Sequence, residues 1–119
     1  MKAILLISHG SRLSQTKEEV VQLLRKLKRK SAADIFEYAF LEIEKPSIPE
    51  GIDVCVRKGA KEIILVLNFL NAGRHVGMDI PQIIRSARKK YSVVTIRSTV
   101  PVGQHPGIVE LFLDMINEL

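Results

Sequence analysis

Four strand-length apolar segments alternate with stretches of helical periodicity along this 119-residue chain. The segments at 2–7, 34–41, 62–67 and 92–100 are predicted strands, because apolar, β-branched and aromatic residues dominate them and turn residues bound them. A β-α-β-α-β-α-β-α order predicts a parallel sheet with helices on both faces. Continuous apolar runs agree with this prediction, since parallel strands are buried on both sides. The pattern predicts one domain over residues 1–119, in which a single compact four-stranded sandwich accommodates every element.

Short capping motifs predict where several helices begin. Ser47 and Glu50 have the spacing of a capping box, and the helix that they open is expected to end near Lys58, with Gly59 after it. Thr16 and Glu19 have the same spacing ahead of the first helical segment.

The third helix is predicted to begin at Asp79, which can act as its N-cap with Pro81 in the first turn. The stretch before it, residues 68–78, is therefore expected to be a loop. The last helix is predicted from an apolar face made by Ile108, Leu111, Phe112, Met115 and Leu119.

Cysteine content and hydropathy place the chain among cytoplasmic globular proteins. The single cysteine, Cys55, cannot form an intrachain disulfide and is flanked by valines, so we expect a small core residue in a reducing compartment. No apolar run approaches the roughly 20 residues that span a bilayer, and the N-terminus lacks the pattern of a signal peptide. We expect no membrane partner.

The charge balance is basic: 18 lysines and arginines against 13 acidic residues, a net charge of +5. The excess is concentrated at 25–30, "RKLKRK", and at 85–90, "RSARKK". Such runs can be solvated helix ends, can attract an anionic small molecule or can bind nucleic acid. Nucleic-acid binding is disfavoured, because the few aromatic residues follow no RNA-stacking pattern.

The three histidines, His9, His75 and His105, each follow a predicted strand. Ligands of open α/β sheets bind at the carboxyl ends of the strands, where the strand order reverses. For an order of 2-1-3-4, that point lies between the first and third strands, whose ends carry His9 and His75. Because neighbouring strands are about 4.8 Å apart, the two imidazoles are expected to share one metal ion or one small substrate. His105 precedes Pro106 at a helix start, and a turn role explains it.

Several familiar site motifs do not occur in the chain. It has no GxGxxG or GxxxxGK[ST] phosphate loop, no GxSxG elbow, and no CxxC or HExxH metal motif. Two histidines, with a carboxylate at most, would form an open and weak site suited to divalent cobalt, nickel, iron or zinc. Such a site suits a protein that releases its metal.

Four stretches carry a resemblance to a known family: "LLISHGSR" (5–12), "FLEIEKPSI" (40–48), "NFLNAGRHVGMDIP" (68–81) and "PVGQHPGIVELF" (101–112). Together they resemble the small, single-domain sirohydrochlorin cobaltochelatases, class II enzymes that insert a divalent metal into a tetrapyrrole. The resemblance covers nearly the whole chain and implies a flavodoxin-like three-layer fold. Asn68 departs from the pattern, since the family often has proline at this position.

The resemblance implies roles for particular residues. His9 and His75 match the two catalytic, metal-binding histidines, and Glu42 is a further candidate metal contact. Glu42 and Glu44 can equally be helix-entry carboxylates. The expected substrate contacts are Gly10, Ser11, Arg12, Gly73 and Arg74, of which the two arginines can also be plain surface residues.

The resemblance also implies an assembly and a substrate metal. Family members of this size are half as long as their two-domain relatives, so a homodimer is expected, with no tightly bound cofactor. Cobalt is the first expectation for the substrate metal, with nickel and iron close behind. Three rival functions stay open: a metal or tetrapyrrole carrier, a small histidine phosphatase-like hydrolase and a basic nucleic-acid module.

Overall fold

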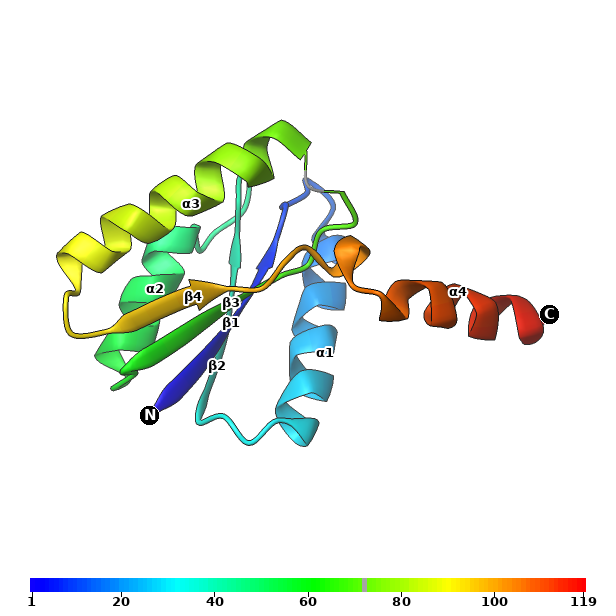
Figure 1. Ribbon diagram of the computed structural model, residues 1–119, viewed down its shortest axis with the longest axis horizontal. Helices are drawn as coiled ribbons and strands as arrows, with labels where there is room; N and C mark the ends of the chain where they lie inside the picture. The colour runs from blue at the N-terminus through cyan, green and yellow to red at the C-terminus, as the bar shows by residue number, and fades with distance from the viewer. Residues whose placement is uncertain (72) are drawn as a thin grey trace.

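The structure, a computed structural model, describes every residue except Ala72 and the side chain of His75. The described residues form four strands, each followed by an α-helix, with one short 3-10 helix between the last strand and the last α-helix (Figure 1). The elements are β1 (Lys2–Ser8), α1 (Ser14–Lys30), β2 (Ile35–Phe40), α2 (Ile48–Arg57), β3 (Glu62–Leu67), α3 (Gly73–Lys90), β4 (Thr95–Ser98), η1 (Val102–Gln104) and α4 (Gly107–Asn117).

The four strands make one parallel sheet in the order β2-β1-β3-β4, as predicted. Side chains alternate between the two faces of a strand, so the odd-numbered and even-numbered residues of β1 and β3 lie on opposite faces of the sheet. Leu5 and Leu65 pair across β1 and β3, and both point toward α2 and α3. Leu6 lies on the opposite face, where it packs against Val20 and Leu24 of α1. The expected sandwich with helices on both faces is confirmed for these three helices.

Local capping signals had mixed success. The Ser47 hydroxyl accepts from the Glu50 backbone N–H (3.3 Å), and the Glu50 carboxylate accepts from the Ser47 N–H (2.9 Å), which confirms this capping box. Gly59 has φ +101° just after α2, as expected of a residue ending a helix. The Thr16–Glu19 prediction is wrong: α1 begins earlier, at Ser14. There the Ser11 hydroxyl accepts from the Leu13 N–H (3.1 Å) and organises the turn instead.

Helix α3 starts six residues earlier than the sequence predicts, at Gly73, so most of the expected loop is helical. Asp79 and Pro81 lie inside the helix and do not open it. The reason is tertiary, because the early turns bury Val76 and Ile80 in the core that covers the sheet. Their burial outweighs the local turn signals of the glycine-rich stretch.

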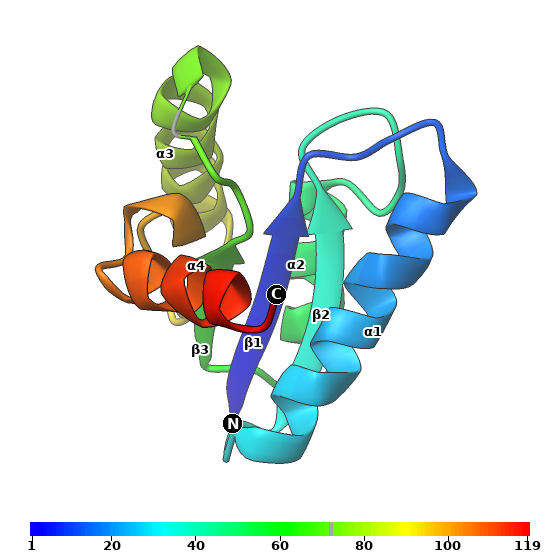
Figure 2. The ribbon, with the colours of Figure 1, turned by 90° about the vertical axis from the view of Figure 1, so that its right-hand side faces the viewer.

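Helix α4 lies outside the sandwich. It follows β4 and η1 and projects away from the sheet on the side where α1 packs (Figure 1, Figure 2). None of its described residues is buried, so the expectation that one compact sandwich accommodates every element is wrong for α4. No described helix combines the length and the hydropathy needed to cross a bilayer.

Candidate functional site

The tips of the two central strands are joined at the carboxyl edge of the sheet. Ser8, the last residue of β1, is buried, and His9 follows it into solvent. The Asn68 backbone N–H, just after β3, donates to the Ile7 carbonyl (2.8 Å), and the Asn68 side-chain amide donates to the Ser8 hydroxyl (3.2 Å). These two hydrogen bonds hold the end of β1, which leads into His9, in a fixed position relative to Asn68.

The His9 imidazole is exposed but has a fixed support. Its ring meets the Phe69 ring edge to face, with the ring centroids 4.6 Å apart and the planes at 67°. Phe69 is itself only 2% exposed, so it presents a rigid apolar wall. This arrangement restricts the orientation of the His9 ring while leaving it open to a ligand.

The loop after His9 is pressed against a second loop, residues 41–46. A Cβ atom on Gly10 would lie 1.9 Å from the Glu42 carbonyl oxygen, and the φ of Gly10 is +101°. The Glu42 N–H donates to the His9 carbonyl (3.0 Å), and the Ser11 N–H donates to the Glu44 carboxylate (2.7 Å). Glycine is therefore the residue that fits at position 10.

These contacts distinguish Glu42 from Glu44, whose roles the sequence left open. The Glu44 side chain braces the loop after His9 through the Ser11 amide. Glu42 is exposed at the same edge, and it contacts that loop through its backbone. A metal-binding role for Glu42 stays a prediction.

A hollow of about 300 Å³ opens beside His9. Residues at the end of β1 and just after β1 and β3 line one part of it, and residues of α1 line the other. Its lining residues are Ser8, His9, Gly10, Thr16, Glu19, Val20, Leu23 and Asn68. It therefore lies where ligands of open α/β sheets bind.

The remaining predicted residues lie around this edge. Arg12 is exposed in the loop before α1, and Gly73 and Arg74 are exposed at the start of α3. The backbone of His75 belongs to the first turn of α3, but its side chain lies outside the described residues, so a site shared with His9 stays a prediction. His105 lies in the turn before α4, where its Nδ1 accepts from the Gly107 N–H (2.9 Å), in keeping with the turn role expected from sequence.

The described side chains contain no group of three or more histidine, cysteine, aspartate or glutamate residues able to hold a metal ion. A metal bound at His9 would need further donors, for which the candidates are Glu42, His75, a second copy of the chain and the substrate.

Gly103 is a supporting residue that sequence reasoning missed. A Cβ atom there would lie 1.7 Å from the Leu70 carbonyl oxygen, and the Gly103 N–H donates to the Phe69 carbonyl (3.1 Å). Segment η1 thus holds the loop that carries Phe69, the support of His9. The glycine in "PVGQHPG" was a signal, but a turn explained it equally well.

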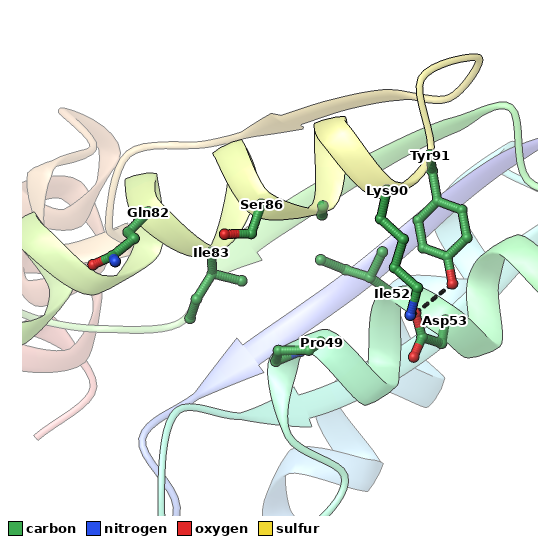
Figure 3. Close-up of a pocket in the computed structure, with 9 residues that line it drawn as sticks. Pro49, Ile52, Asp53, Gln82, Ile83, Ser86, Lys90 and Tyr91 are labelled. Atoms are coloured by element: carbon green, nitrogen blue, oxygen red, sulfur yellow. Dashed lines mark hydrogen bonds and ion pairs between the residues drawn. The ribbon is translucent and has the colours of Figure 1, made fainter.

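A second hollow, of about 310 Å³, lies between α2 and α3 on the other face of the sheet (Figure 3). Three of its polar side chains contact one another: the Tyr91 hydroxyl donates to the Asp53 carboxylate (2.5 Å), and the Lys90 ammonium lies 3.2 Å from the same oxygen. The hydrogen bond from Tyr91 lowers the pKa of Asp53. Because these charges are already paired and lie away from the strand tips, we take the His9 hollow as the candidate site.

Comparison with known proteins identifies the family of this chain. The sequence model of the CbiX family matches residues 3–119. The chain is 44% identical over 84 residues to a sirohydrochlorin cobaltochelatase of Methanococcus aeolicus, covering 71% of this chain and 59% of that protein. It is 33% identical over 115 residues to a chloroplastic sirohydrochlorin ferrochelatase of Arabidopsis thaliana, covering 97% of this chain and 49% of that protein.

A solved structure of a relative has the same fold. The sirohydrochlorin chelatase SirB of Bacillus subtilis, crystallised with cobalt, superposes with a TM-score of 0.87 at 30% identity, over 99% of this chain and 50% of that one. The chain spans about half the length of the SirB and Arabidopsis chains. It belongs to the CbiX family, and these three relatives are named as chelatases of sirohydrochlorin.

Proposed function

We propose that this chain inserts a divalent metal ion into sirohydrochlorin. The observation that carries the proposal is His9, an exposed imidazole at the tip of a central strand, held against Phe69 beside an open hollow. Family membership makes a chelatase reaction the leading expectation for such a site.

The reaction needs a group that accepts protons and binds metal. Two pyrrole N–H protons must leave the macrocycle as the metal enters. A neutral imidazole, with an ordinary pKa near 6.5, can take a proton and can also hold a divalent ion. We assign these two roles to His9 and His75. Holding the ring and the metal together supplies much of the remaining acceleration.

Charge supports a polyanionic substrate. Sirohydrochlorin carries eight carboxylates, and the chain has a net charge of +5. Arg12 and Arg74 are exposed in the loop before α1 and in the first turn of α3, so we assign them to the propionate and acetate groups of the ring. Gly10, Ser11 and Gly73 lie in the same two segments, and we assign them to contacts with the edge of the sirohydrochlorin ring.

Cobalt is the metal that we propose first, with nickel and iron as alternatives. Imidazole ligands suit all three ions, and cells select among them largely by availability. The relatives include both cobaltochelatases and ferrochelatases. We further propose that the chain provides half of the ring-binding cleft and acts as a homodimer in the cytoplasm, where its single cysteine stays reduced.

Absorbance spectroscopy tests the proposal. Mixing the protein with sirohydrochlorin and Co²⁺, Ni²⁺ or Fe²⁺ should change the spectrum of the ring as the metal enters. His9→Ala and His75→Ala should each slow this change at least about tenfold, as expected for the loss of a proton-transfer group. His105→Asn is the matched control, because asparagine keeps an acceptor for the Gly107 amide and should leave the rate unchanged.

The outcomes separate the rival functions. Full activity in both histidine variants would contradict the proposed mechanism. Tight binding of the ring without accelerated metallation would identify a carrier instead of an enzyme.

A further inference from the structure

Three arginines line one hollow at the edge of the sheet. Strand β4 is an edge strand, and α3 packs against it (Figure 1). A hollow of about 480 Å³ opens between these two elements, and we call it the arginine hollow. Its lining residues are Pro81, Ile84, Arg85, Arg88, Arg97 and Ser98. The arginine hollow shares no lining residue with the His9 hollow.

Helical spacing brings the α3 side of this hollow together. Pro81, Ile84, Arg85 and Arg88 recur three and four residues apart, so they lie on one face of the helix. Ile84 is buried, whereas the two arginines are exposed beside it. The basic run at 85–90, whose role the sequence left open, therefore places two of its four cations in the arginine hollow.

Arg88 is held in a fixed orientation. Its Nε and Nη2 atoms both donate to the Ile96 carbonyl of β4, at 3.1 Å and 2.6 Å. These bonds use one edge of the guanidinium group. The other edge, formed by Nη1 and Nη2, keeps two N–H groups that can donate to one anion. Because the Ile96 carbonyl already holds the side chain, an anion that binds to this edge orders little that is not ordered before.

The other two arginines differ in their pairing. Arg97 donates from Nη2 to the carboxylate of Glu62 on β3. Arg85 makes no hydrogen bond or ion pair with any residue that the structure describes. Three guanidinium groups against one carboxylate leave a net charge of +2 at the hollow. Like charges three residues apart on a helix repel one another, and an anion between them would remove this repulsion.

Protection of the sheet edge explains part of this arrangement. A charged residue on an edge strand opposes pairing with another chain, and Arg97 fits that role. Arg88 satisfies a carbonyl group of the same strand. Neither explanation accounts for Arg85, which lies on the helix and adds a third guanidinium group to the hollow.

We propose that the arginine hollow binds a small organic molecule that carries a phosphate group. A phosphate monoester has close to two negative charges at neutral pH and three acceptor oxygens, which match the charge of +2 and the three arginines. Guanidinium groups bind phosphate through paired hydrogen bonds. The Ser98 hydroxyl can add a further donor.

The size of the hollow favours an organic phosphate over the bare ion. A volume of about 480 Å³ lies within the range of small-molecule sites. The exposed Pro81 offers an apolar surface next to the arginines, on which an organic group can pack. The inference is independent of the proposed function, because no residue of the arginine hollow is assigned to metal insertion.

NMR titration is the first test, and it locates the site. At constant ionic strength, inorganic phosphate and phenyl phosphate should both shift the Nε–H signals of Arg85, Arg88 and Arg97. The signal of Arg25, an exposed arginine in the other basic run, should not move. Phenyl phosphate should bind more tightly than inorganic phosphate, because its ring can contact Pro81. Equal shifts at Arg25, or the same shifts with acetate at the same concentration, would overturn the proposal.

Substitution of Arg85 is the second test, with calorimetry as the measurement. Arg85→Gln should weaken phenyl phosphate binding about tenfold, as expected for the loss of a hydrogen bond to a charged group. Arg85→Lys keeps the charge but not the paired donors, so it should restore only part of the affinity. Arg25→Gln removes the same charge from α1 and is the matched control, which should bind like the native chain. Equal affinities in Arg85→Gln and Arg25→Gln would contradict the assignment.

Two further measurements separate this site from other partners of a basic surface. Duplex DNA that binds the chain and is weakened equally by Arg25→Gln and Arg85→Gln would indicate general attraction of polyanions and would count against a small-molecule site. Metallation of sirohydrochlorin should be unchanged in Arg85→Gln, so the chelatase proposal and this one are tested apart. Slower metallation in Arg85→Gln together with native affinity for phenyl phosphate would assign Arg85 to the ring and refute the phosphate site.

Discussion

The Asn68 side-chain amide donates a 3.2 Å hydrogen bond to the Ser8 hydroxyl, tying the end of β1 to the residue that follows β3. Ser8 ends one strand and Asn68 follows the strand paired with it in the sheet, yet the two residues are 60 positions apart in the chain. His9 and Phe69 are the next residue on each side, so the bond sets the frame in which the imidazole meets its aromatic support.

Asn68→Ala should therefore loosen the site as well as the sheet. The buried Ser8 hydroxyl would lose its partner, at a cost of about 1 kcal/mol in the free energy of unfolding. We expect a broader range of His9 ring orientations and slower metallation. Urea unfolding and the absorbance assay measure the two effects, and Asn71→Ala, at an exposed loop position, is the control. Identical stability and rate in Asn68→Ala and Asn71→Ala would show that the bond has no such role.

Gly10→Ala should disrupt the loop after His9. The added methyl would meet the Glu42 carbonyl oxygen at 1.9 Å in a backbone conformation that alanine rarely adopts, so we expect a loss of about 1–3 kcal/mol in stability. Gly77→Ala is the matched control inside α3, where a Cβ meets nothing within 4 Å. There alanine should raise stability by up to about 1 kcal/mol. Equal unfolding midpoints for the two variants in urea would contradict this prediction.

Tyr91→Phe should weaken the protein's resistance to acid. The Tyr91 hydrogen bond lowers the pKa of Asp53 below its ordinary value of 3.8. A carboxyl group whose pKa is lower in the folded state stabilises the fold above its unfolded pKa, and this contribution disappears as the pH falls through the folded value. Without the hydroxyl, the pKa of Asp53 should rise and acid unfolding should begin at higher pH. Carboxyl NMR titration measures the pKa directly, with Tyr38→Phe on the other face of the sheet as control; an unmoved Asp53 titration would refute the prediction.

Cys55 should be inert in the native protein. Burial raises the pKa of its thiol to about 12, so almost no thiolate is present at pH 8 and reagents cannot reach the sulfur. A thiol reagent should modify Cys55 only at the rate of unfolding, while a Val93→Cys chain, with its new thiol at a 77% exposed position, should react at once. Rapid labelling of the native thiol would show that α2 opens far more readily than the buried core implies.

The sequence was informative wherever the signal lay in neighbouring residues. Apolar period and length predicted the strands, and the Ser47–Glu50 capping box is confirmed because both of its hydrogen bonds join residues three positions apart. The strand order 2-1-3-4 was taken together with the flavodoxin-like fold that the family resemblance implies, and the sheet confirms it. His9 was placed at a strand tip because it directly follows the buried run of β1. The loop prediction was wrong for residues 73–78, because their turn signals are local, whereas the burial of Val76 in this helical segment depends on the sheet.

What the sequence determined by itself is the alternating α/β order, the buried cysteine and the position of His9 after the first strand. Tertiary structure alone decided that Gly10 abuts Glu42, that Gly103 supports the loop of Phe69, and that α4 leaves the sandwich with its apolar face uncovered. The physical reason is the distance along the chain between the residues that interact. Periodicity and capping are encoded in contiguous residues, but a close approach between distant segments depends on how the whole sheet brings them together.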